Sequence, residues 1–399
     1  MRSAIVLSTH TMGLGVIRSL GIMGVPIIAI YHSDKQMGHV SKYVKHSLEV
    51  PDPEKSGEKF IEMLISTASR FEGSIVFPVS DETLVLTSKR KSLLEKYCTV
   101  ACTEWDITKK FIIKNNTYTL ANAIGVPAPK TIIPRSFEDA VKYSQLIEYP
   151  CLVKPSQSHL FHKKFGEKMM LVDNIDQLLA VFRQTSEEGI EVVFQEFIPG
   201  NDDQVVNYNS YFWNGQPMVE FAAQHIRNAP PFFGSPCVVA SKEIPEVIEP
   251  GRKILHAMGF YGYSCTEFKK DPRDGVYKLI DVNGRHNLST LLAVHCGINF
   301  PWIHYKHLVE GELPSSNGFR ENIYWIDLIR DAFYSISHIK SNPSFIQFAK
   351  PYIHSRQFAI LDWKDPKPFL RRIVYLIKRA FKELFNVPFQ NLRDKIGGK

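Results

Sequence analysis

Three polar side chains alternate with apolar residues in the segment LIDVNGRHN at residues 279–287. Asp281, Asn283 and Arg285 occupy every second position, which is typical of a strand with one buried and one exposed face. The exposed face would present a carboxylate, an amide and a guanidinium in one row. Oxygen ligands suit hard divalent cations, and a guanidinium can neutralise charge that develops on a transferred phosphoryl group. The row therefore indicates a magnesium–phosphate site, and a solvated hairpin face is the alternative.

A second carboxylate is expected beside this row. Glu267 lies fourteen residues before Asp281, and the sequence DPRDG at 271–275 is a turn signal between two strand-like segments. A hairpin around that turn would bring Glu267 next to Asp281, because residues opposite each other on antiparallel strands are neighbours. Glu267, Asp281 and Asn283 are therefore the candidate metal ligands.

Other strand ends carry groups that suit a nucleotide. Lys154 lies near the end of the strand-like segment CLVKP, where a lysine can reach a phosphate, although a surface lysine is the alternative. The segment QEFIPG ends another strand, and the carbonyl of Glu196 and the amide of Ile198 could contact an adenine edge. Asp202 and Asp203 follow, and either contacts with ribose hydroxyls or an ordinary acidic turn would explain them.

The beginning of the chain predicts a small doubly wound α/β domain. Residues 4–7 and 27–30 predict buried parallel strands around a helical segment at 13–24. The segment SIVFPVSDE at 74–82 predicts a strand that runs into a loop, with Ser80 and Asp81 at its carboxyl end. Ligands of open α/β sheets bind at that edge, so these two side chains are candidates for contact with a substrate amine.

The first strand-to-helix connection contains Gly13 and Gly15, which resemble part of a dinucleotide-binding fingerprint. The third glycine is missing, because position 18 is arginine, while Asp34 lies at the distance of a ribose-binding acid. A tight turn explains the two glycines equally well, so a nicotinamide-dependent enzyme is kept only as an alternative. His10, near this turn, and His286, beside Arg285, are interpreted as structural histidines.

After residue 110 the pattern changes to mixed and then antiparallel strands, which favours an α+β arrangement. Residues 108–124 predict a helix with Lys114 in its early turns, ended by the Gly-Val-Pro sequence at 125–127. Residues 320–360 predict packed helices and loops. Further strands are predicted at 131–134, 151–155, 191–197, 205–213, 217–224, 262–270 and 276–283, and further helices at 137–147, 176–187 and 246–258.

Composition and charge restrict the class of protein. The chain of 399 residues is 44% hydrophobic and 22% charged, which is typical of a globular protein. Its net charge of +7 equals the excess of nine basic over two acidic residues in 366–399, so the rest is neutral and no nucleic-acid partner is expected. The six cysteines form no CxxC pair and no apolar stretch is long enough to cross a membrane. We therefore expect a cytoplasmic protein with reduced thiols.

The basic segment has a pattern of its own. Residues 367–386, KPFLRRIVYLIKRAFKELFN, predict an amphipathic helix with a basic and an apolar face. Such a helix could lie on anionic lipid at the inner face of the membrane. Packing on its own domain or on a second subunit, as in a homodimer, is the alternative.

In their order along the chain, these segments resemble the ATP-grasp superfamily of ATP-dependent ligases. The resemblance covers roughly residues 1–312 and rests on IIKNNTYTLANAIGVPAPKT, YPCLVKP, FQEFIPG and CTEFKKDPRDGVYKLIDVNGR. Within the superfamily the chain is most similar to stand-alone carboxylate–amine ligases such as D-aspartate ligase, and to a single synthetase unit of carbamoyl phosphate synthase. It has no glutaminase-like segment, which disfavours the second.

The resemblance implies a role for each matching residue. Lys114 and Lys154 would contact the phosphates of ATP, the segment Glu196, Phe197 and Ile198 would hold adenine, and Asp203 would bind ribose. Glu267, Asp281 and Asn283 would hold Mg²⁺, with Mn²⁺ as an alternative ion, and Arg285 would contact the γ-phosphate or an acyl phosphate.

The sequence departs from the family pattern at two points. The family usually has glutamate where this chain has Asp281, which still offers carboxylate oxygens. The loop after Lys154 is normally rich in glycine, but SQSHLFHKKFGEK contains one glycine. Lys163, Lys164 or Lys168 could supply charge there, and Lys168 is preferred because it precedes a strand.

The fold implied by the resemblance combines α/β and α+β parts. We expect a Rossmann-like α/β domain at 1–107 and then an ATP-grasp fold. Its lid subdomain would cover 108–195 and its catalytic antiparallel-sheet subdomain 196–315. A helical C-terminal extension would cover 316–399.

The function implied is ATP-dependent joining of a carboxylate to an amine through an acyl phosphate, on an amino acid or an envelope or polysaccharide precursor. Arg227, on a loop after the strand that follows FQEFIPG, is the candidate for binding the acid or a phosphate. The alternative is an ATP-grasp protein that senses nucleotide without catalysis. That alternative would be favoured by loss of Glu267, Asn283 or Arg285, and all three are present.

Overall fold

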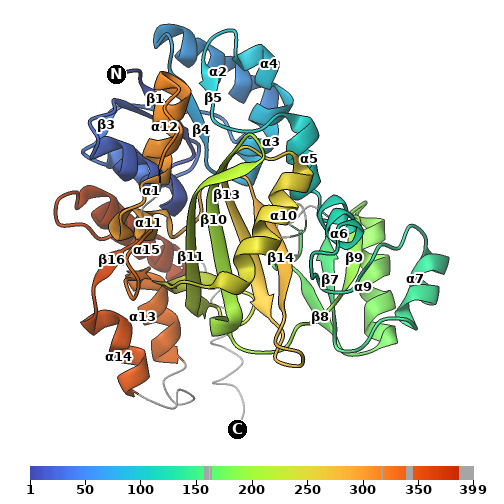
Figure 1. Cartoon of the computed structure of the whole chain (residues 1–399). Helices are drawn as coiled ribbons and strands as arrows, with labels where there is room; N and C mark the ends of the chain where they lie inside the picture. Colours follow the sequence, from blue (N-terminus) through green and yellow to red (C-terminus); the bar gives the residue numbers. More distant parts are fainter. Residues whose placement is uncertain (157–160, 162–163, 316–317, 338–344, 386–399) are drawn as a thin grey trace.

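The apolar segments at the start of the chain form a five-stranded parallel sheet with the strand order β3-β2-β1-β4-β5 (Figure 1). This computed structural model describes residues 1–156, 161, 164–315, 318–337 and 345–385. The strands of the first sheet are β1 (Ala4–Leu7), β2 (Ile27–Tyr31), β3 (Val44–Glu49), β4 (Ile75–Pro78) and β5 (Thr99–Val100). The helices that accompany it are α1 (Thr11–Gly21), α2 (Gly57–Arg70), α3 (Asp81–Lys89) and α4 (Lys91–Leu94).

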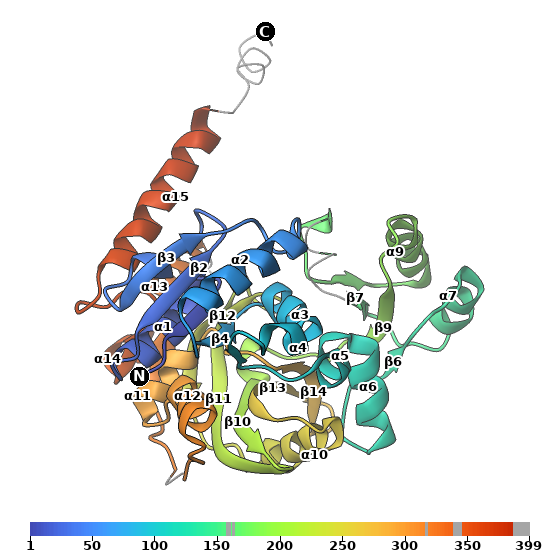
Figure 2. The ribbon, with the colours of Figure 1, turned by 90° about the horizontal axis from the view of Figure 1, so that it is seen from above.

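The second sheet is small and antiparallel, with the order β6-β9-β7-β8. Figure 2 shows this sheet and its two helices at one side of the molecule. Ser136 and Asn174 cap the two helices by accepting hydrogen bonds from backbone N–H groups in the first turn. The elements are β6 (Thr131–Ile132), α7 (Phe137–Ser144), β7 (Cys151–Pro155), β8 (Met170–Val172), α9 (Ile175–Glu187) and β9 (Val192–Glu196).

The third sheet has seven strands in the order β14-β13-β10-β11-β12-β15-β16. Its strands are β10 (Val205–Trp213), β11 (Gln216–Ala229), β12 (Ser235–Ser241), β13 (Gly262–Lys270), β14 (Tyr277–Asn283), β15 (Tyr324–Ile326) and β16 (Arg356–Phe358). The helices of this part of the chain are α5 (Trp105–Ile112), α6 (Lys114–Ala123), α10 (Ile248–Met258), α11 (Thr290–Cys296), α12 (Phe300–Glu310), α13 (Leu328–Ser337), α14 (Phe345–Ile353) and α15 (Lys367–Phe385).

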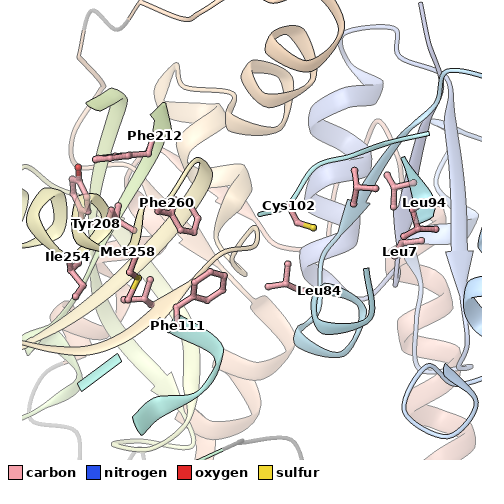
Figure 3. Packing of buried hydrophobic residues seen from close by; sticks show 14 of the residues in the cluster. Leu7, Leu84, Leu94, Cys102, Phe111, Tyr208, Phe212, Ile254, Met258 and Phe260 are labelled. Atoms are coloured by element: carbon pink, nitrogen blue, oxygen red, sulfur yellow. The ribbon is translucent and has the colours of Figure 1, made fainter. Parts of the chain in front are cut away.

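One hydrophobic core joins the first sheet to the third. Figure 3 shows Leu84 and Cys102 of the N-terminal part facing Phe111, Met258 and Phe260 of the other part, and all five belong to one buried cluster. Because burial of apolar surface stabilises a packed arrangement, this shared core fixes the N-terminal sheet against α5 and α10. The edge of the N-terminal sheet is thereby held close to the β13–β14 hairpin.

The structure differs from the sequence-based expectation in several places. The expected helix at 108–124 is two helices, α5 and α6, separated at Ile113. The expected loop after β4 is helix α3, which begins at Asp81. The region 320–360 contributes β15 and β16, and β15 pairs with β12, so the large sheet continues past residue 315. Both strands have three residues, which is too short for alternation to be visible in the sequence.

Within the described residues, no helix has the length and apolar character needed to cross a bilayer.

Candidate active site

The β13–β14 hairpin places the two expected carboxylates opposite each other. Glu267 pairs with Asp281, and the register then shifts so that Phe268 pairs with Leu279. This bulge at Ile280 turns Leu279 and Val282 into the same hydrophobic core, although they are three residues apart. The hydroxyl of Tyr118 donates a hydrogen bond to the Ile280 carbonyl at 2.7 Å. The core therefore anchors the strand while Asp281 lines a cavity.

A cavity of about 550 Å³ gathers most of the candidate residues. Glu267, Asp281, Asn283 and Arg285 line it from the hairpin end. Burial and the neighbouring charge of Asp281 raise the pKa of Glu267 to about 7. Two carboxylates held together at the base of a cavity need a cation to be stable as a charged pair.

An amide that the sequence reasoning missed lies beside them. Asn207 of β10 pairs with Glu267 across the sheet, is 2% exposed and lines the cavity. Among the described residues its Oδ1 atom has no hydrogen-bond partner. A buried oxygen without a donor is costly unless a ligand satisfies it. Glu267, Asp281, Asn283 and Asn207 thus form an oxygen-rich set that fits Mg²⁺. The same strand, VVNYNSYFW, also contains the polar residues Asn209 and Ser210, so the sequence alone does not single out Asn207.

Three lysines enter the same cavity from different elements. Lys114 begins α6 and forms an ion pair with Asp281. Lys154 lies on β7, and burial together with the charge of Lys114 lowers its pKa to about 8. Lys168 donates a hydrogen bond to the Ser235 hydroxyl at 2.8 Å. The structure therefore brings Lys114, Lys154 and Lys168 together in one cavity, where a polyphosphate would balance their charge.

The segment expected to hold adenine forms part of the cavity wall. Glu196, Phe197 and Ile198 are lining residues. The Glu196 carboxylate accepts a hydrogen bond from the Lys130 amide at 3.0 Å and forms an ion pair with Arg273, so its side chain points into the hairpin contact. The ring of Phe197 lies 6.2 Å from the ring of Phe233, centroid to centroid, and forms an apolar wall.

Asp203 does not join this set, because it is not among the residues that line the cavity. Its carbonyl accepts a hydrogen bond from Gln224 at 2.5 Å. The neighbouring Asp202 carboxylate accepts hydrogen bonds from the amides of Asn228 and Phe232, both at 2.9 Å. Of the two acids, Asp202 thus fixes the loop that follows β11.

Arg285 connects the hairpin to the N-terminal sheet. Its guanidinium forms a two-point ion pair with Asp81, at 2.5 and 3.1 Å. Ser80 is the N-cap of α3, and its hydroxyl is used in a capping box with Thr83. The expected pair at the end of β4 therefore has divided roles: Ser80 starts a helix, and Asp81 holds the arginine.

Arg227 lies within strand β11 and not on the expected loop, and the structure does not bring it to the cavity. Its guanidinium donates to both carboxylate oxygens of buried Asp331, at 2.8 and 2.9 Å, and stacks over Phe348. Arg330, the next residue before Asp331, lines the cavity instead and donates to the carbonyls of Ala229 and Ser235. No spacing pattern connects Arg330 with the other site residues, so sequence reasoning had no signal for it.

The remaining candidates are structural. His286 is 3% exposed and stacks on Tyr263 at a centroid distance of 4.2 Å, and burial holds its pKa well below the usual range. A Cβ atom on Gly13 would lie 2.0 Å from the Ser8 carbonyl oxygen. The close approach of α1 to β1 therefore explains this glycine without a dinucleotide.

Residues of the small antiparallel sheet and of the large, mainly antiparallel sheet line a cavity that contains lysines and carboxylates, and the parallel N-terminal sheet shares a hydrophobic core with the rest of the molecule. This combination of fold and site resembles that of the ATP-grasp class.

The comparisons with known proteins agree with this class. No family model matches the sequence. The D-aspartate ligase of Enterococcus faecium is 24% identical over 233 residues, 54% of this chain and 53% of the ligase. The carbamoyl phosphate synthase large chain of Pyrococcus furiosus is 26% identical over 203 residues, 49% of this chain and 18% of that protein. The chain thus spans about half of the first relative and less of the second.

Solved structures share the fold over a larger part of the chain. A biotin carboxylase from Campylobacter jejuni has a TM-score of 0.67 at 16% identity and covers 81% of this chain and 74% of its own. An L-amino acid ligase from Bacillus licheniformis has a TM-score of 0.62 at 17% identity and covers 78% and 74%. By sequence relatives and by fold, the chain is similar to ATP-grasp enzymes.

Proposed function

We propose that the chain is an ATP-dependent ligase that joins a carboxylate to an amine through an acyl phosphate. One observation carries the proposal. Glu267 and Asp281 are opposite each other on neighbouring strands, and Lys114, Lys154 and Arg285 line the same cavity. Carboxylates for a divalent cation and cations for phosphate oxygens are the two requirements of phosphoryl transfer.

The reaction proposed has two steps. A carboxylate oxygen of the acid attacks the γ-phosphorus of ATP, and ADP leaves. The amine nitrogen then attacks the acyl carbon, phosphate leaves, and the nitrogen loses a proton. Such chemistry depends on positioning and on neutralising charge, and it requires no protein nucleophile.

Each cavity residue has a proposed part. Lys114 and Lys154 bind the ATP phosphates, and Arg285 binds the transferred phosphoryl group. The oxygen set of Glu267, Asp281 and Asn283 would hold Mg²⁺, or Mn²⁺ in its place, which neutralises phosphate charge when bound. The backbone of Glu196 and Ile198 is proposed to hold adenine. Asp203 is given no part, because it does not line the cavity.

The acid is proposed to bind near Arg330. Arg227, through its two hydrogen bonds to Asp331, fixes the start of α13, which carries Arg330. Arg227 would then act on the acid indirectly, because it holds helix α13, whose Arg330 lines the cavity. An amino acid or an envelope precursor with a free carboxylate would suit a cationic site of this kind.

The test is release of ADP and phosphate from Mg-ATP against a panel of amino acids, small carboxylates and amines. Wild type is compared with Arg285→Ala and with the control Arg252→Ala, whose guanidinium pairs with Glu220 outside the cavity. We expect release that depends on one acid–amine pair, is lost in the first variant and is kept in the second.

Binding of ATP without turnover on any pair, including pairs from envelope extracts, would contradict the proposal and favour a nucleotide sensor.

A homodimer is a further proposal. The biotin carboxylase domain of the Hydrogenobacter thermophilus 2-oxoglutarate carboxylase, with a TM-score of 0.66, was solved as a dimer with MgADP. Light scattering of the purified chain measures its mass directly.

A further inference from the structure

Helix α15 carries a row of exposed apolar side chains. Leu370, Val374, Ile377 and Phe381 are 58%, 51%, 50% and 56% exposed. Their spacing of four, three and four residues places them on one side of an α-helix. Trp363, four residues before the helix, is 85% exposed. Contiguous exposed apolar surface of this kind marks a site of interaction.

The side next to this row is basic. At 100° per residue, Lys367, Arg371, Lys378 and Lys382 fall within about 60° of one another, beside the apolar row. Arg372 and Arg379 extend the positive charge further around the helix, and Glu383 is the single acid in the sequence of the helix. The helix therefore presents an apolar stripe with a positively charged flank.

The base of the helix is fixed to the body of the protein. The Arg371 guanidinium donates to the Gln36 carbonyl at 3.3 Å and pairs with Asp34 at the same distance. The ring of Phe369 packs against a buried cluster of the large sheet. Figure 2 shows α15 leaving the body beside β3, with its later turns extending beyond the other elements. The exposed stripe is thus carried on a helix with a defined direction.

We propose that this face of α15 docks on a lipid bilayer that carries anionic headgroups. An amphipathic helix lies in the plane of the bilayer interface with its apolar side chains among the acyl chains and its basic side chains at the headgroups. Trp363 would lie at the same level, because an indole ring is favoured at the membrane–water interface.

A second copy of this chain fits the surface less well. Pairing of two such stripes would bring one basic flank close to another, and like charges repel. The stripe also spans only about two heptads, shorter than the three or four that indicate a coiled coil. An anionic bilayer, in contrast, complements both the apolar stripe and the positive flank.

The experiment is sedimentation of the full chain with vesicles of phosphatidylcholine alone or with about one-third phosphatidylglycerol. The test variant is Leu370→Glu with Ile377→Glu. Its matched control is Leu146→Glu with Ile175→Glu, which changes the same residue types at exposed positions after α7 and at the start of α9, 54% and 39% exposed. A third variant, Lys378→Glu with Lys382→Glu, removes positive charge and leaves the apolar stripe.

We expect wild type and control to bind the anionic vesicles at least about tenfold more tightly than the neutral ones. The Leu370/Ile377 variant should bind both the anionic and the neutral vesicles at least about tenfold more weakly than wild type. The Lys378/Lys382 variant should lose the preference for anionic lipid. Thermal unfolding confirms that each variant is folded. Equal sedimentation of all four proteins would overturn the proposal. A Leu370/Ile377 variant that only lowers the oligomeric mass would also overturn it and would assign the stripe to a second copy.

Discussion

Asp281 illustrates how one side chain can have two partners in this site. Its carboxylate pairs with Lys114, and it lies directly across the strands from Glu267. In the reaction proposed above, this lysine would exchange the carboxylate for a phosphate oxygen when a cation and phosphates bind. In the proposed ligase, the ion pair of the free protein would hold the lysine in place before ATP binds. This view makes the negative charge at position 281 more important than the length of its side chain.

Exchange of Asp281 for asparagine and for glutamate separates charge from length. We expect Asp281→Asn to lower kcat/KM for Mg-ATP on the order of 100-fold, because one anionic oxygen ligand and the partner of Lys114 are lost. Asp281→Glu should retain activity within about tenfold, because the carboxylate is kept.

The control is Asp274→Asn in the turn of the same hairpin, where the carboxylate is 47% exposed and lies 3.6 Å from Lys278. Steady-state kinetics over a range of Mg²⁺ concentrations is the measurement. Equal losses in the asparagine and glutamate variants would show that the shape of the site, and not its charge, is what position 281 supplies.

At the scale of elements, the close approach of α1 to β1 depends on one glycine. A Cβ atom at Gly13 would lie 2.0 Å from a backbone oxygen, which cannot move as a flexible side chain can. A Cβ atom at Gly15 would meet its nearest neighbour at 3.4 Å, an ordinary contact. The two positions therefore differ in their need for glycine, although they are only two residues apart in α1.

Alanine at each position tests this difference. We expect Gly13→Ala to lower the free energy of unfolding by about 1–3 kcal/mol, because α1 must shift away from β1. Gly15→Ala should change it by no more than about 1 kcal/mol and in the stabilising direction, because alanine favours a helix interior. Urea unfolding measures both. Similar losses in the two variants would mean that the turn, and not the contact with Ser8, sets the need for glycine.

The hairpin was the element best predicted from sequence, since its turn signal and its alternating polar residues are local. Those signals predicted the pairing of Glu267 with Asp281, which the structure confirms. The bulge at Ile280 could not be predicted, because it arises from the packing of Leu279 and Val282 into one core. Arg330 and Asn207 were missed for a similar reason: their position in the cavity depends on sheet order and not on spacing.

The expectation for Arg227 shows the limit of such reasoning. A basic residue after a strand near the nucleotide segment was a reasonable candidate for binding an acid. Its partner Asp331 lies 104 residues later and is 1% exposed, so the sequence around Arg227 contains no sign of it. Long-range ion pairs of this kind are set by tertiary packing, which composition and periodicity do not encode.

At the scale of the whole molecule, the segment before α15 returns to the N-terminal domain. Asp365 is fully buried and accepts hydrogen bonds from Arg18 at 3.0 Å, from the Ser41 hydroxyl at 2.7 Å and from the Lys42 amide at 2.8 Å. Arg18 also donates to the Ile360 carbonyl at 2.9 Å. This cluster joins residues 347 positions apart in sequence and sets the direction in which α15 leaves the body.

Removal of one partner from this cluster should be far more costly than removal of a surface ion pair. Asp365→Ala leaves the Arg18 guanidinium buried without its counter-charge, and we expect a loss of about 3–5 kcal/mol in the free energy of unfolding. Glu58→Ala is the control, because Glu58 pairs with Arg90 at the surface and is 76% exposed, where such a pair contributes about 0–1 kcal/mol.

Chemical unfolding of Asp365→Ala, of Arg18→Ala and of the variant that combines them gives the coupling energy between the two buried partners. The control Glu58→Ala is unfolded in the same way. We expect the double variant to be less destabilised than the sum of its singles, because the second substitution removes a charge that the first has left unpaired. Additive losses would mean that Asp365 is held mainly by Ser41 and Lys42. The direction of α15 would then depend on the loop at 41–42, and not on helix α1.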